Sequence, residues 1–283
     1  MPEKRVVSRE QKRSSSIGRH PVPSANLVSN RLVSVAELEQ MRCAGGESSM
    51  SRNWRWTAYD QIKKHATHVD FPCFFAAKAF DSGAPIFLFV ESSKLPESRS
   101  AIAAGLEEYL QIVTKRSGWG AAATVFFIVL KPQSPVRSLE TYHSQAWDVL
   151  SYLHHHDPRE WPKEIPTDMD NPDWSFYFNG VPMFVNMSCP AHYARPSRNL
   201  GNSLALVMQP RAAFDEIAGN TPAGLQVRKR IRARIQKYDL IGPSPALGAY
   251  GDKKNREWAQ YGLTENNDEV PGTCPYKKSF QKK

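Results

Sequence analysis

The chain has 283 residues and an ordinary hydrophobic fraction of 41%, so it forms one large domain or two small ones. Its apolar runs are far shorter than the roughly 20 residues that cross a bilayer, and its N-terminus lacks the apolar core of a signal peptide. We therefore expect a cytoplasmic protein without membrane partners. The net charge of +9 lies mostly in the two ends of the chain, which argues against a nucleic-acid partner for the nearly neutral body.

Residues 1–50 have the composition of a flexible arm. They hold eight Lys or Arg, five Glu, a run of three serines and dispersed prolines. Such a segment buries too little apolar surface to fold alone. We interpret it as a largely disordered, basic N-terminal arm, in which only Val33–Met41 forms a short helix.

Five helices or strands are predicted in the first half of the remaining chain. Residues 53–68 predict a helix with an Asn N-cap. Residues 73–80 and 84–91 predict two strands of a hairpin around an Asp-Ser-Gly turn. Apolar side chains at a spacing of three to four predict a helix over residues 98–117. The apolar run 122–130 is typical of a central strand covered on both faces.

The second half begins with the clearest helix, residues 139–154, which carries a continuous apolar stripe. Four prolines keep residues 157–173 in a loop. An Asn-Gly pair within residues 174–187 is a strong hairpin signal. A further strand is predicted at residues 204–208, and a helix at residues 221–238.

Strands joined by hairpins, with helices between them, indicate an α+β fold. We expect residues 51–283 to form a single domain. Its mostly antiparallel sheet would be packed by several helices.

A series of sequence phrases resembles a known family. Five of them, in chain order, are FPCFF at Phe71–Phe75, WPKEIPTDMDNPDW at Trp161–Trp174, FNGVPMFV at Phe178–Val185, PAHYARPSR at Pro190–Arg198 and LGAYGDKKNREWAQY at Leu247–Tyr261. The chain resembles the YqcI/YcgG family, which includes haem-dependent N-hydroxylases of guanidine groups.

The resemblance implies a haem-dependent monooxygenase. Its cofactor would be heme b (protoheme IX), and its co-reactants would be O2 and an unidentified electron donor. The substrate would be L-arginine or another guanidino small molecule. The product from arginine would be Nω-hydroxy-L-arginine, formed in antibiotic or other secondary-metabolite biosynthesis. The alternative is a non-catalytic haem or small-molecule binding protein whose basic arm binds an acidic partner.

A haem iron needs an axial ligand, for which Cys and His are the usual choices. Cys73, beside small alanines, is the first candidate, although a free cysteine is also typical of an apolar core. His154 and His143 lie on one helical stripe and are the next candidates, with Cys274 after them. His154 is equally suited to the C-terminus of its helix. His192 is a candidate for the distal side.

Arginines suit the haem propionates or a substrate carboxylate, because they form bidentate charged hydrogen bonds. The candidates are Arg195, Arg198 and Arg211, with surface salt bridges as the alternative. The basic stripe within residues 228–237 is interpreted as a solvated helix face.

A cationic guanidine substrate favours a carboxylate partner. Asp168, Asp252 and Glu257 stand in the matched phrases and are the candidates. Trp174 and Trp258 are candidates for the pocket wall through cation–π contact, although each one singly is more typical of an ordinary core.

Overall fold

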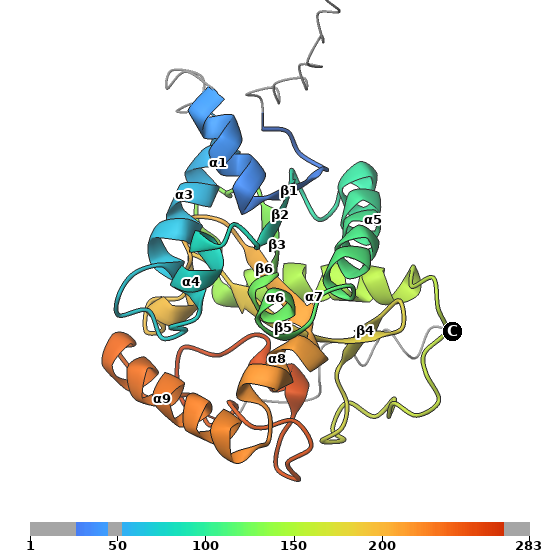
Figure 1. Ribbon diagram of the computed structural model, residues 1–283, viewed down its shortest axis with the longest axis vertical. Coiled ribbons are helices and arrows are strands. Elements are labelled where there is room, and N and C mark those ends of the chain that lie inside the picture. Colours follow the sequence, from blue (N-terminus) through green and yellow to red (C-terminus); the bar gives the residue numbers. More distant parts are fainter. Residues whose placement is uncertain (1–26, 45–52, 269–283) are drawn as a thin grey trace, which may run out of the picture.

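A computed structural model describes residues 27–44 and 53–268 (Figure 1). A six-stranded sheet runs through its centre in the order β1-β2-β3-β6-β5-β4. Its strands are β1 (Leu32–Ser34), β2 (Ile86–Val90), β3 (Phe126–Leu130), β4 (Phe176–Phe178), β5 (Val181–Ser188) and β6 (Ala205–Pro210). Every neighbouring pair is antiparallel except β2 with β3, which is parallel. The predicted α+β class with a mostly antiparallel sheet is confirmed.

Helices cover both faces of this sheet (Figure 1). Those in the described residues are α1 (Val35–Ala44), α3 (Trp54–Ala66), α4 (Ala76–Asp81), α5 (Pro96–Val113), α6 (Gly118–Ala123), α7 (Leu139–His155), α8 (Arg211–Ala218) and α9 (Pro222–Tyr238), with 3-10 turns η1 (Pro196–Arg198) and η2 (Glu257–Gln260). In the segments described, no helix has both the length and the apolar character that a membrane crossing requires.

The two faces of the sheet belong to separate cores because strand side chains alternate in direction. Phe126 and Ile128 of β3 pack in the core that includes α5 and α7. Phe127 and Val129 of the same strand pack in the core that includes α3. Two side chains far apart in sequence therefore meet only if they lie on the same face.

Local chemistry explains the elements that match their predictions. The Asn53 side chain accepts a hydrogen bond from the Arg55 N–H and caps α3, as predicted. In the same way Ser138 caps the predicted helix α7. Asn179 and Gly180 have φ angles of 47° and 82°, the left-handed pair that a tight two-residue hairpin needs between β4 and β5.

The predicted hairpin over residues 73–91 is wrong. Its first half forms α4, and its second half forms β2, which pairs with β1 and β3 instead. A short apolar run fits a strand or a buried helix equally well, and alanines favour the helix. The same ambiguity explains why the predicted strand 122–130 begins only at Phe126, after α6.

Part of the predicted arm belongs to the fold. β1 pairs with β2 through Val33 and Phe87, and Leu38 of α1 is fully buried. The short helix predicted at Val33–Met41 is present but begins after this strand. The remainder of the arm, apart from residues 27–44, lies outside the described residues.

Candidate functional site

A recessed cavity of about 290 Å³ lies between the sheet and the helices α4, α6, α8 and α9. This volume is near the lower end of the roughly 300–1,000 Å³ typical of ligand pockets. Its walls are mainly apolar, and its aromatic residues are Phe71, Phe75, Phe80, Trp119, Phe127, Phe184 and Phe214. It is therefore suited to a largely apolar ligand.

Cys73 lies in the wall of this cavity. The residue is exposed, yet burial by the surrounding protein raises the pKa of its thiol. The exposure of Cys73 and the raised pKa of its thiol are consistent with each other if its exposed surface faces the cavity. The N–H groups of Phe75 and Ala76 and the charge of Arg234 partly offset the effect of burial. The first-choice ligand from the sequence thus stands where a ligand molecule could reach it.

Arg198 also lines the cavity. It is 6% exposed, and its Nη1 donates to the Tyr261 carbonyl oxygen at 3.4 Å. Burial, followed by the nearby charge of Arg195, lowers the pKa of Arg198 to about 10. Arg198 is the only one of the three candidate arginines that faces the cavity among the described residues.

Arg195 and Arg211 have structural partners instead. Arg195 is fully buried, and its guanidinium donates to the carbonyl oxygens of Thr264, Gly242 and Asn266. Arg211 forms two hydrogen bonds of 3.1 and 2.9 Å to Asp215. Neither residue lines the cavity, so the assignment of both to propionates is not supported by their positions.

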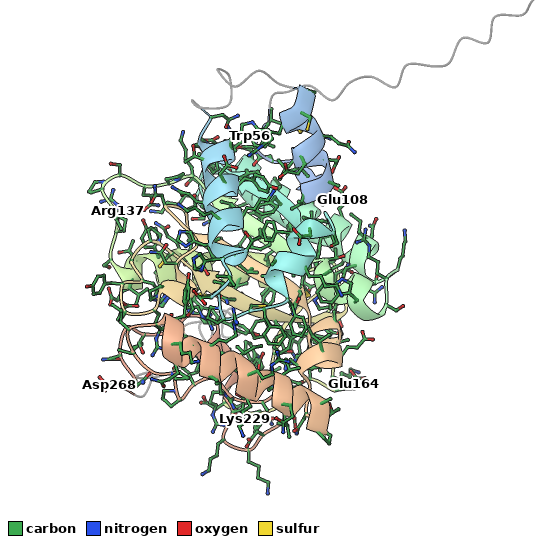
Figure 2. The ribbon with its side chains drawn as sticks, turned by 60° about the vertical axis from the view of Figure 1, so that its left-hand side comes forward. Trp56, Glu108, Arg137, Glu164, Lys229 and Asp268 are labelled. Carbon is green, nitrogen blue, oxygen red and sulfur yellow. The ribbon has the colours of Figure 1, made fainter. Side chains whose placement is uncertain are left out.

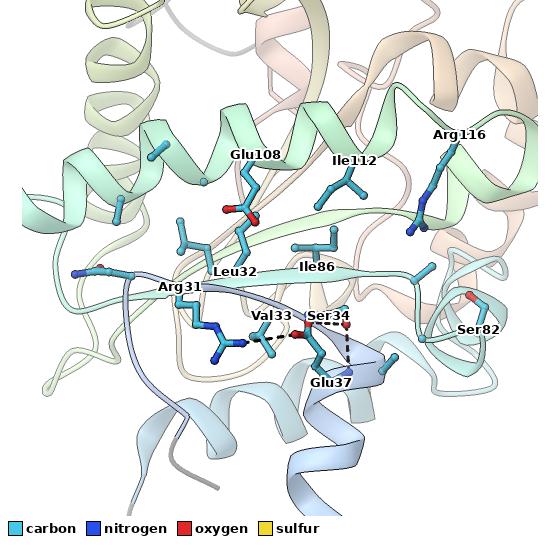
Figure 3. Close-up of a pocket in the computed structure, with 18 residues that line it drawn as sticks. Arg31, Leu32, Val33, Ser34, Glu37, Ser82, Ile86, Glu108, Ile112 and Arg116 are labelled. Atoms are coloured by element: carbon cyan, nitrogen blue, oxygen red, sulfur yellow. Dashed lines mark hydrogen bonds and ion pairs between the residues drawn. The ribbon is translucent and has the colours of Figure 1, made fainter. Parts of the chain in front are cut away.

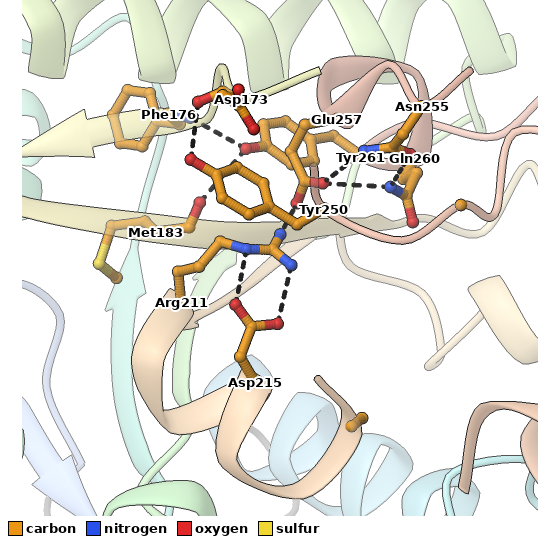
Figure 4. A network of polar contacts seen from close by, with 12 residues as sticks. Asp173, Phe176, Met183, Arg211, Asp215, Tyr250, Asn255, Glu257, Gln260 and Tyr261 are labelled. Atoms are coloured by element: carbon orange, nitrogen blue, oxygen red, sulfur yellow. Dashed lines mark hydrogen bonds and ion pairs between the residues drawn. The ribbon is translucent and has the colours of Figure 1, made fainter. Parts of the chain in front are cut away.

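Glu257 is a second carboxylate partner of Arg211 (Figure 4). It is fully buried, its second oxygen accepts from Gln260 at 3.1 Å, and the Tyr250 ring lies 4.2 Å from the Arg211 guanidinium carbon. Burial raises the pKa of Glu257, while Arg211 opposes this shift. The carboxylate of Glu257 is therefore already paired with groups of the protein itself.

The other two acidic candidates are exposed. Asp168 and Asp252 each accept a backbone N–H two residues along the chain, which is the geometry of a surface turn. No Asp or Glu from the described parts of the chain lines the cavity. The predicted carboxylate partner for a guanidine is therefore not found at this cavity among the described residues.

Trp174 and Trp258 are core residues. Both are buried in the cluster on the α5 and α7 side of the sheet. They do not line the cavity, whose wall holds Trp119 instead. Trp119 is the second residue of α6 and lies within a Gly-Trp-Gly sequence, which is typical of a helix break. The sequence pattern therefore gave no indication that Trp119 lines a cavity.

The candidate histidines are not part of the cavity wall. His154 and His143 belong to α7, and His143 packs 5.8 Å from the ring of His192, centre to centre. His192 forms a 2.6 Å hydrogen bond with Glu265. None of these three histidines lines the cavity that contains Cys73.

Acid is expected to destabilise the fold through His143 and His192. Burial is the main reason why the pKa of each is lowered to about 4. Because histidine in the unfolded chain titrates near pH 6.5, the unfolded chain binds protons first, and stability falls as the pH drops from about 6.5 towards 4. We expect a loss of about 1 kcal/mol per histidine between pH 6 and pH 5 in urea denaturation.

The matched variants separate this effect from general acid denaturation. His143→Leu should remove about half of the fall, since one of two buried groups is then absent. His155→Ala, which changes an exposed histidine, should leave the fall unchanged. An equal fall in His143→Leu and the unmodified chain would contradict the assignment.

The basic stripe of α9 is only partly a solvated face. Lys229 is exposed at the outer surface (Figure 2). Arg234, however, donates to the carbonyl oxygen of Phe71 at 2.8 Å, and Arg230 stacks over Phe74 at 4.7 Å. These arginines hold the loop that carries Cys73 against α9, a role that the charge pattern alone could not indicate.

A second hollow lies between β1 and α5. This groove of about 690 Å³ is bordered by Glu108, Arg116 and Glu37, and Glu37 accepts a 2.8 Å hydrogen bond from Ser34 N–H (Figure 3). None of the predicted site residues lines it. The cavity around Cys73 is therefore the better candidate site.

Comparison with known proteins agrees with the sequence phrases. Residues 60–277 match the YqcI/YcgG family. The chain belongs to this family. It is 40% identical to the "Putative N(omega)-hydroxy-L-arginine synthase DcsA" of Streptomyces lavendulae, over 79% of this chain and 84% of that protein.

Two further family members come from Bacillus subtilis (strain 168). YqcI is 36% identical over 75% of this chain and 84% of its own length, and YcgG is 34% identical over 73% and 80%. Both are named as uncharacterized proteins. No solved structure matches the chain.

The YqcI/YcgG region contains the whole cavity but not β1 and α1. It also contains Cys274, the last ligand candidate, which lies outside the described residues. Elsewhere in the region, within the described ranges, no three His, Cys, Asp or Glu side chains are grouped as a metal-ion site. This arrangement does not bear on haem, whose iron is held by the porphyrin and needs only an axial ligand from the protein.

Proposed function

We propose that the chain is a haem-dependent N-hydroxylase that acts on the guanidine group of L-arginine or a related guanidino compound. Family membership and the name of the Streptomyces relative support this reaction class. The single observation that carries the proposal is the recessed apolar cavity with Cys73 in its wall and Arg198 buried at its lining.

The residues of the cavity fit a protoheme. Its aromatic walls suit a flat apolar ring, and the Cys73 thiolate is the kind of ligand that favours O–O cleavage. The guanidinium of Arg198 suits a carboxylate. When bound, haem would supply the activation of O2, which no side chain provides.

The reaction balances with O2 and a separate electron donor. O2, two electrons and two protons convert one guanidine N–H into N–OH, and the second oxygen atom leaves as water. In this proposal Cys73 would hold the haem iron, and the aromatic walls would exclude water from the reacting guanidine. The amide oxygens of Asn186 and Gln209, on the sheet floor, are acceptors for guanidine N–H groups, because no described acidic side chain lines the cavity.

Purified full-length protein tests the proposal directly. We expect a haem Soret band at roughly one haem per chain after growth with adequate iron. With O2, a reductant and L-arginine, mass spectrometry should detect Nω-hydroxy-L-arginine. L-Citrulline, which keeps the shape but loses the guanidinium, should give no hydroxylated product.

Two results would contradict the proposal in different ways. A protein without a Soret band that also fails to bind added hemin would remove the cofactor. A haem-loaded protein that hydroxylates no guanidino compound would instead be a non-catalytic haem protein, the alternative indicated by the sequence.

A further inference from the structure

We propose that Arg198 is the carboxylate-binding group of the cavity, buried beside it without an ionic partner until a ligand carboxylate enters. This inference rests on the proposed function for the identity of the ligand. The site itself rests on the geometry of Arg198 and the polar side chains around it.

The guanidinium of Arg198 has unused hydrogen-bonding capacity. It carries five N–H donors, but the hydrogen bond to Tyr261, at 3.4 Å, is at the long limit for such a contact. In the described segments Arg198 forms no ion pair. Asp239 attracts it from nearby, but the two oxygens of Asp239 accept from Ser197 at 2.8 and 2.7 Å. A buried guanidinium without an ion pair lowers the stability of the fold, and such destabilising groups are typical of ligand sites.

The other two arginines of the cavity wall, unlike Arg198, form short hydrogen bonds to backbone carbonyl oxygens. Arg228 donates to the carbonyl oxygens of Ala218 and Gly248, the latter at 2.6 Å. Arg232 donates to the Leu247 carbonyl oxygen at 2.5 Å. Both fasten neighbouring segments of the chain, whereas Arg198 fastens none by a short side-chain bond.

The floor of the cavity adds further unsatisfied polar groups. Asn186 on β5 and Gln209 on β6 belong to the cavity-facing set of their strands. Asn186 accepts one hydrogen bond from Ser188 at 3.3 Å, and the Gln209 amide has no protein partner among the residues described. A wholly apolar ligand would leave these groups unpaired, so the ligand carries polar atoms at this end.

The carboxylate has two possible sources. One is the α-carboxylate of a guanidino amino acid, and the other is a propionate of haem. Two ligand pairs separate them, since agmatine is arginine without its carboxylate, and hemin dimethyl ester is hemin with its propionates masked.

Binding of these four compounds to the full chain tests the proposal by titration calorimetry and by quenching of tryptophan fluorescence. Trp119 lies in the cavity wall and provides the fluorescent reporter. In at least one pair, we expect the carboxylate-bearing member to bind about a hundredfold more tightly, as loss of a buried charged hydrogen bond implies. The pair that shows this preference identifies the source.

Variants assign the preference to Arg198. Arg198→Met should reduce it to nearly none, and Arg198→Lys should restore part of it because the charge remains. Arg137→Met changes an exposed arginine (Figure 2) and should bind as the unmodified chain does. Arg198→Met should also resist urea at least as well as the unmodified chain, whereas an arginine needed for the fold would lower the midpoint on removal.

The proposal is overturned if neither pair shows the preference in the unmodified chain, or if Arg198→Met keeps it. The first criterion needs no variant, so it applies even if Arg198→Met fails to fold. The proposed function fails separately. If the arginine pair shows the preference while no hydroxylated product forms, the carboxylate site stands and the reaction does not.

Discussion

Replacing Cys73 with alanine is expected to remove the absorption signature of a thiolate-ligated haem and to abolish N-hydroxylation. Cys73 is the only candidate ligand from the sequence that lines the cavity among the described residues. The loss of activity should exceed the roughly 10–100-fold that removal of an outer-shell partner of a metal ligand causes. The measurement is the spectrum of the ferrous carbon monoxide complex, in which thiolate-ligated haems absorb to the red of histidine-ligated ones.

A matched control is available in Cys189, which is 1% exposed and lies in the core on the other side of the sheet. Cys189→Ala should keep both the spectrum and the activity. If Cys73→Ala keeps its thiolate spectrum, the ligand assignment is wrong. If haem is lost from His154→Ala but not from Cys73→Ala, the ligand lies on α7.

Replacing Glu257 with alanine is expected to lower the free energy of unfolding by about 1–3 kcal/mol, because it removes one of the two carboxylates that pair with the buried Arg211. Urea denaturation followed by circular dichroism measures this loss. Haem binding should change little, since Glu257 does not line the cavity. A hundredfold loss of arginine binding in Glu257→Gln, with stability unchanged, would restore Glu257 as the substrate partner.

Two further variants confirm the cause. Asp252→Ala removes an exposed carboxylate and should change stability by less than about 0.5 kcal/mol. Replacing the pair together, as Arg211→Met with Glu257→Leu, should recover most of the loss, since no buried charge then remains at this position. A double variant as unstable as Glu257→Ala would contradict this explanation.

The fold could be predicted from sequence where one local signal decided the structure. The stripe of α7 and the Asn179-Gly180 turn are of this kind. The parallel pairing of β2 with β3 depends on which distant strands meet, and no local pattern encodes that choice. α8 was missed because it has only eight residues and its N-terminus has no side-chain cap.

The site was predicted less completely than the fold. Residue type indicated Cys73 and Arg198 as candidates, and both line the cavity. Spacing along α7 grouped His143 with His154, but spacing cannot tell which face of the sheet a helix will cover. Arg195 and Arg198 stand three residues apart with the same chemistry, and only tertiary contacts distinguish the one that binds carbonyl groups from the one that faces the cavity.

The three residues of β1 have a consequence for any shortened form of this protein. They cover the outer edge of β2, whose residues Ile86–Val90 are all buried, yet they lie outside the region that matches the family. A chain trimmed to that region would expose the edge of β2 that now pairs with β1 at Ile86, Phe87 and Leu88. An exposed strand edge can pair with the same edge of a second molecule, so β1 protects this protein against self-association.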